Sequence, residues 1–213
     1  MMFSVFDPCT GMLSLNWLST MIFIIMMPYK MWITENKISL MLKLISKTLN
    51  KEMSMLMKYK GTNLIMISMF MLILFNNLMG LMPYVFTSSA HLTFSLTLAL
   101  PMWMSLMLFG WMNKTNSMFC HLVPTGTPGI LMPFMVMIET VSNIIRPGSL
   151  AVRLTANMIA GHLLMSLLGS NLSATVLIMT FIIFITLMLF ELAVAVIQSY
   201  VFMTLMTLYS SEI

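Results

Sequence analysis

Acidic and basic side chains are scarce between residues 130 and 209 of this chain, and most of the few present are of types that can carry protons. They are Glu139, Arg146, Arg153, His162 and Glu191, all set within long apolar stretches. Buried histidine and carboxylate groups form proton relays in membranes, because both can titrate near neutral pH. Arginine keeps its charge, since its pKa stays above about 12. The set therefore combines groups that can exchange protons with fixed cations.

Arg153 is the most demanding residue of the set. It lies in the apolar stretch from Ser149 to Gly169, which otherwise has the composition of a membrane helix. A guanidinium at the centre of a bilayer costs about 2.5–3.5 kcal/mol. Since it cannot lose its charge, it must be paired, hydrated or used in the function. Arg153 therefore predicts a membrane protein that handles charge.

Helix geometry spreads the ionisable groups across the membrane. Glu139 lies 14 residues before Arg153, or about 21 Å along a helix axis, and His162 follows after about 13 Å. We expect Glu139 near the inner face, Arg153 near the middle and His162 towards the outer face. Asn157 lies one turn from Arg153 on the same helix face, where it either serves the proton path or joins two helices.

The next apolar stretch returns across the membrane and carries Glu191 and Gln198. Pairing the two stretches about a turn at residues 169–171 places Glu191 opposite Arg153 or slightly beyond it. A stagger between the helices would instead bring Glu191 near His162. Gln198 is expected between Arg153 and Glu139. Glu191 is thus either part of a proton relay or a packing partner of Arg153.

The composition requires a membrane. The chain of 213 residues is 60% hydrophobic and only 8% charged, whereas soluble domains carry about 25% charged residues. We predict an all-α membrane protein forming one domain over residues 1–213, with about five transmembrane helices and one interfacial amphipathic helix. The elements are a first span at 12–27, the interfacial helix at 34–60, spans at 61–82 and 90–111, and long helices at 130–168 and 171–209.

The two long helices must form an antiparallel, strongly tilted hairpin. Each is near 39 residues, or about 58 Å, while the hydrocarbon core is about 30 Å thick. Pro147 predicts a kink in the first of them. The lysines of residues 34–60 predict a helix on the inner surface, although a solvated linker has the same composition. With five crossings, the N-terminus is then outside and the C-terminus inside.

The sequence gives no sign of a cofactor or metal site. Cys9 and Cys120 are too few and too far apart for a disulfide framework or a metal cluster. The 30 methionines are spread through every span, which favours apolar filling over a copper site and fits the codon usage of a mitochondrial genome. The glycines near Gly126 lack the lysine of a phosphate-binding loop, so we do not expect an enzyme.

Four motifs resemble one family, subunit a of the rotary F-type ATP synthase in its mitochondrial form. The most specific is LAVRLTANMIAGHLLM at 150–165, and the others are LFNNLMGLMPYVFT at 74–87, HLVPTGTPGILMPFMVMIET at 121–140 and ELAVAVIQSYVF at 191–202. The similarity covers most of the chain after Gly61. The sequence departs from some members of the family at Arg146-Pro147-Gly148, because those members carry no charge at this point.

This resemblance implies a proton-conducting partner of a rotor ring. In the family, subunit a lies against a ring of small subunits, each with one buried carboxylate, and two offset half-channels lead to that ring. By matching positions, Arg153 would separate the half-channels, His162 and Glu191 would belong to the outer one, and Glu139 to the inner one. Asn157 and Gln198 match polar positions near the arginine.

The resemblance also implies location and partners. The expected location is the mitochondrial inner membrane, with the N-terminus in the intermembrane space and the C-terminus in the matrix. The expected partners are the rotor ring, the peripheral stalk and other membrane-sector subunits, and membrane lipids. Protons are the transported ion, and no nucleic acid is expected. Two other classes remain open from the residues alone. A transporter acting alone would need a substrate cavity or internal repeats, and a purely structural subunit would leave the cost of Arg153 unexplained.

Overall fold

The computed structural model describes residues 6–8, 14–21, 24–25, 34–57, 60–82, 84–123, 128–170 and 177–212. All regular structure in these ranges is helical, which confirms the all-α prediction. The α-helices are α2 (Lys37–Leu56), α3 (Lys60–Gly80), α4 (Leu92–Asn113), α5 (Thr115–Leu122), α6 (Met132–Ser170) and α7 (Leu177–Glu212). Short 3-10 helices are η1 (Leu15–Met21), η2 (Ser88–Ala90) and η3 (Gly129–Leu131).

Within the described ranges, 4 helical segments are long and apolar enough to cross a membrane: Gly61–Gly80, Leu92–Asn113, Gly129–Ser170 and Ile178–Ser211. They match the predicted spans and confirm a multi-span membrane protein. The further span predicted at 12–27 lies partly outside the described residues. The described part of it contains η1, so this fifth crossing stays a prediction.

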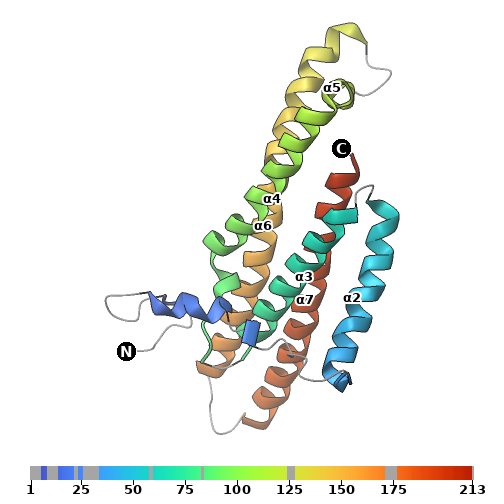
Figure 1. The fold of residues 1–213 in the computed structure, drawn as a ribbon. Helices are drawn as coiled ribbons and strands as arrows, with labels where there is room; N and C mark the ends of the chain where they lie inside the picture. The colour runs from blue at the N-terminus through green and yellow to red at the C-terminus, as the bar shows by residue number, and fades with distance from the viewer. Residues whose placement is uncertain are drawn as a thin grey trace.

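The spanning helices form two packed pairs. Helix α4 packs against α6, α3 packs against α7, and the pairs meet where α6 contacts α7 (Figure 1). The C-terminal part of α4 and the N-terminal part of α6 extend beyond α3 and α7 (Figure 1). Helix α5 packs against both α4 and α6. The short η2 contacts α3, α4 and α6 near their opposite ends. The buried core fills the space between the pairs, with Ile73, Ala99, Ala151, Leu154 and Phe202 among its members.

Helix α2 has the two-sided character predicted for residues 34–60. Leu49 and Met53 are buried, where α2 packs against α3 and α7, while Lys43, Lys47 and Lys51 are exposed. Figure 1 shows α2 running alongside α3 rather than across it. Its position on the inner membrane surface therefore stays a prediction.

Helices α6 and α7 form the long antiparallel hairpin. They contain 39 and 36 residues, or about 58 and 54 Å of helix. Pro147 is buried within α6, which continues through it. The turn predicted at Gly169–Asn171 was placed too early, because α6 includes Gly169 and Ser170. Ser170 Oγ donates to the Leu167 carbonyl over 2.8 Å, so the serine supports the last helical turn instead of leaving it.

Candidate proton-transfer site

Among the described residues, three contacts that involve polar side chains show the register of α6 against α7. They are the Arg146 guanidinium 5.1 Å from the centre of the Tyr209 ring, the Asn157 amide donating to Gln198 Oε1 over 3.0 Å, and His162 Nε2 4.0 Å from Glu191 Oε1. The partners on α7 come in the reverse order of those on α6, as antiparallel helices require. Every predicted site residue except Arg153 and Glu139 takes part in one of these contacts.

The register corrects two positions predicted from a simple hairpin. Glu191 lies beside His162 and not opposite Arg153, so the staggered arrangement is the one that occurs. Gln198 meets Asn157, on the side of Arg153 away from Glu139, and not between Arg153 and Glu139. The stagger arises because α6 continues to Ser170, later than predicted. At the end of the bundle where α6 stops, α7 extends beyond it (Figure 1).

His162 and Glu191 form a buried pair, which we call the outer pair after the membrane face predicted for it. Their side chains are 11% and 4% exposed. His162 Nε2 and both Glu191 carboxylate oxygens lack a hydrogen-bond partner among the described residues. A buried carboxylate without donors is costly. The outer pair is therefore a place where a proton or a water molecule completes the bonding.

Gly161 creates the space for the Glu191 carboxylate. A Cβ atom on Gly161 would overlap both carboxylate oxygens, so only glycine admits Glu191 at this depth against α6. The ring of Phe6 meets the His162 ring edge-on, with centroids 6.0 Å apart. The outer pair is thus enclosed by both neighbouring helices and an aromatic ring.

Arg153 points away from the helix bundle. Its side chain is exposed, whereas the neighbouring Leu150, Ala151 and Leu154 of α6 are no more than 1% exposed. Arg153 forms no ion pair with any residue that the structure describes, and Glu191 is not its partner. Because a lone guanidinium in a spanning helix is costly, the charge of Arg153 must be met by water, by lipid headgroups or by another molecule.

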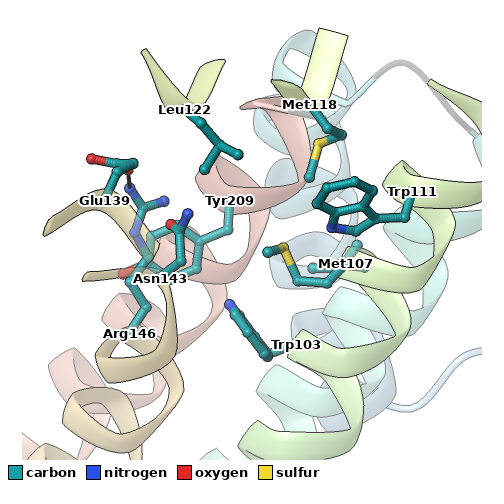
Figure 2. Close-up of a pocket in the computed structure, with 10 residues that line it drawn as sticks. Trp103, Met107, Trp111, Met118, Leu122, Glu139, Asn143, Arg146 and Tyr209 are labelled. Atoms are coloured by element: carbon teal, nitrogen blue, oxygen red, sulfur yellow. Dashed lines mark ion pairs between the residues drawn. The ribbon is translucent and has the colours of Figure 1, made fainter. Parts of the chain in front are cut away.

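A second acid–base pair, the inner pair, lies on α6 beside a cavity. Arg146 Nη2 is 3.6 Å from Glu139 Oε1, with side chains 26% and 37% exposed. The cavity holds about 360 Å³ between α4, α5, α6 and α7. Figure 2 shows Glu139, Asn143 and Arg146 on one side of it, and Trp103, Met107 and Trp111 from α4 on the other. Glu139 therefore lines a cavity whose walls are partly polar and partly apolar, at this end of the bundle.

Comparison with known proteins identifies the family. The sequence model of the ATP synthase A chain family matches residues 11–211. ATP synthase subunit a of Drosophila simulans is 57% identical over 219 residues, which cover 100% of this chain and 98% of that protein. Subunit a of Anopheles quadrimaculatus is 54% identical over 221 residues, with the same coverage. This chain belongs to the ATP synthase A chain family.

The family match covers both residues of the outer pair, both residues of the inner pair, and Arg153. The sequence interpretation missed one residue that shapes the site, Gly161. Gly161 has no functional group, so nothing in the sequence provided a chemical reason to select it. The signal that could have found it is a glycine inside a spanning helix next to His162, which is typical of a close contact with another helix. Asn77 on α3 is fully buried, and its Nδ2 donates to the Ala195 carbonyl one turn from Glu191, over 3.4 Å.

Proposed function

We propose that this chain is the proton-translocating subunit of the ATP synthase membrane sector, with two offset half-channels kept apart by Arg153. The observation that carries the proposal is the position of Arg153. It is exposed on a spanning helix, between the buried outer pair and the cavity beside the inner pair. A charge so placed can bind the carboxylate of a partner and block direct passage of protons.

The partner proposed for Arg153 is a ring of small rotor subunits with one buried carboxylate each. A carboxylate facing lipid must be protonated, because an unpaired charge in hydrocarbon is costly. Beside Arg153 the ionised form is favoured, so the proton leaves there. Each charge that crosses the membrane supplies about 2.3 kcal/mol per 100 mV. Rotation then follows from the side on which the next carboxylate regains a proton.

The outer half-channel would deliver protons through His162 and Glu191. The 4.0 Å between His162 Nε2 and Glu191 Oε1 is longer than a hydrogen bond, and one bridging water or a small side-chain rotation would close it. The inner half-channel would release protons through the cavity lined by Glu139. Asn157 and Gln198, bonded to one another, would hold α6 and α7 together one turn from Arg153.

The proposed setting is the mitochondrial inner membrane, with the N-terminal segment towards the intermembrane space and the C-terminus in the matrix. Support comes from the insect relatives, all subunits of ATP synthase, and from the lysine-rich α2. At the end of the bundle opposite the C-terminus, Trp17 of η1 packs edge-on against Phe86, with centroids 5.4 Å apart.

We propose a non-catalytic role, in which nucleotide chemistry belongs to other subunits of the complex.

The test is cysteine cross-linking from the Arg153 face to the rotor ring in the assembled complex, in a background without Cys9 and Cys120. Ala156 is exposed one turn from Arg153, whereas Met158 is 2% exposed on the core side. Ala156→Cys should cross-link to the carboxylate-bearing helix of a ring subunit and stop both synthesis and pumping. Met158→Cys is the matched control and should give no cross-link. An intact complex with no cross-link from Ala156→Cys would remove the proposed rotor contact.

A further inference from the structure

A groove between α2 and α3 is not used by the proton path. It holds about 560 Å³. Its lining includes Lys43, Lys47 and Asn50 from α2, and Asn63, Leu64 and Ile67 from α3. The α2 wall therefore carries two amines beside polar groups, whereas the α3 wall carries the aliphatic side chains. An amphiphilic ligand can match both walls.

The α2 wall is positively charged. Lys43 and Lys47 lie one helical turn apart, so both ammonium groups reach the same part of the groove. Lys43 Nζ also contacts Glu35 Oε1 at 2.6 Å, which offsets one charge. Lys47 is exposed and forms no ion pair with the residues that the structure describes. The groove thus keeps a net positive rim suited to a phosphate.

Asn63 adds a polar group that lacks a partner. It is 7% exposed, and its Nδ2 donates to Asn50 Oδ1 over 3.4 Å. Its own Oδ1 is buried without a hydrogen-bond partner in the described part of the chain. Buried amide oxygens are nearly always bonded, so a donor such as a hydroxyl group fits this position in the groove.

The α3 wall offers apolar surface beside these polar groups. Leu64 is 74% exposed and the neighbouring Ile65 is 47% exposed. Both belong to the spanning segment Gly61–Gly80, so acyl chains surround them in a membrane. Lysine side chains combine with such surface well, because their aliphatic stems lie along it while the ammonium group reaches polar groups.

We propose that the α2–α3 groove is a binding site for one phospholipid with an anionic, hydroxyl-bearing headgroup. Lys43 and Lys47 bind its phosphate, Asn63 Oδ1 accepts a hydrogen bond from a headgroup hydroxyl, and the acyl chains lie along Leu64 and Ile67. The site is independent of the proton path, since it shares no residue with the outer or inner pair. It fastens α2 to α3 through the lipid.

The experiment uses the assembled complex in phosphatidylcholine vesicles containing a small share of photoactivatable phosphatidylglycerol. Cross-linked peptides are then identified by mass spectrometry. We expect labelling at residues 61–68 on α3, reduced about five-fold in Lys43→Gln and in Lys47→Gln, and by about the product of the two in the double variant Lys43→Gln with Lys47→Gln. Asn63→Leu should lower the labelling further, because it removes the acceptor for the headgroup hydroxyl.

The matched control is Lys37→Gln with Lys51→Gln, which removes the same charge from exposed positions of α2 that do not line the groove. This control should keep the labelling at residues 61–68. An equal loss in both double variants would show diffuse attraction of anionic lipid only and overturn the site. Equal labelling by photoactivatable phosphatidylcholine would also overturn it, since the lysines would then select nothing.

Discussion

The outer and inner pairs place the same acid in two different surroundings. Glu191 meets His162 across two helices, with side chains 4% and 11% exposed. Glu139 meets Arg146 along one helix, with side chains 37% and 26% exposed, beside an open cavity. Histidine can lose its charge and arginine cannot. We therefore expect the outer pair to pass a proton between its two groups, directly or through one bridging water, and the inner pair to exchange protons with water that enters the cavity.

Packing explains this difference. Gly161 lets the Glu191 carboxylate lie directly against α6, and the outer pair is enclosed as a result. Arg146 is held between Glu139 and the Tyr209 ring and lines the cavity. This is the end of the bundle where α6 extends past α7 (Figure 1). The chain thus encloses one acid and leaves the other open, with Arg153 between their levels.

Removal of the charge between the two pairs should have the largest effect. Arg153→Ala should abolish proton-driven ATP synthesis and ATP-driven pumping, because nothing else in the described chain would hold the ring carboxylate ionised. Passive proton leak should rise. The measurements are ATP synthesis and dye-detected pumping in vesicles with the assembled complex. Normal synthesis by this variant would refute the assigned role of Arg153.

Neutralising each acid should separate the two pairs. Glu191→Gln should lower proton flux to about one hundredth, the usual cost of losing a buried acid–base group. Glu139→Gln should lower it less than about ten-fold, since water in the cavity can substitute for the carboxylate. Proton flux through the membrane sector, measured after removal of the catalytic sector, compares them directly. Equal losses would mean that burial does not distinguish the two acids.

Filling the space at Gly161 should weaken the outer pair while the fold persists. In Gly161→Ala the new Cβ displaces the Glu191 carboxylate from His162, and we expect about a ten-fold lower proton flux. The carboxylate ends a flexible side chain, so it can move without disturbing the helices. Gly148→Ala is the control, because a Cβ at Gly148 meets nothing within 4 Å.

Gly148→Ala should leave proton flux unchanged and stabilise α6 by at most about 1 kcal/mol. Assembly and thermal unfolding of both glycine variants show whether a change in flux has a structural cause. Wild-type flux in Gly161→Ala would contradict the close contact between Gly161 and Glu191.

The smallest effect is expected at the inner pair's cation. Arg146→Gln removes a half-exposed ion pair and a contact with the Tyr209 ring, each contributing about 0.5–1 kcal/mol. We expect a lower thermal stability of the membrane sector with less than a two-fold change in flux. A double-mutant cycle with Tyr209→Leu should show coupling between the two residues. Additive effects would mean that the ring does not hold the guanidinium.

Several features could be read from the residues alone, because the bilayer imposes them. Apolar stretches of spanning length gave the helices, and their bounds differ by a few residues from the observed α3, α4 and α6. Arg153 was evident because a permanent charge in such a stretch is costly wherever its side chain points. The proton-transfer roles of His162, Glu191 and Glu139, and the first span at 12–27, remain predictions.

The pairing of those residues was decided by the tertiary structure. Helix arithmetic gives positions along one axis, but the stagger between α6 and α7 depends on where each helix ends and how the side chains pack between them. This placed Gln198 against Asn157 and Glu191 against His162. The sequence determined which groups lie in the membrane, since lipid excludes unpaired polar groups, while packing determined which of them are buried together and which, like Arg153, remain exposed.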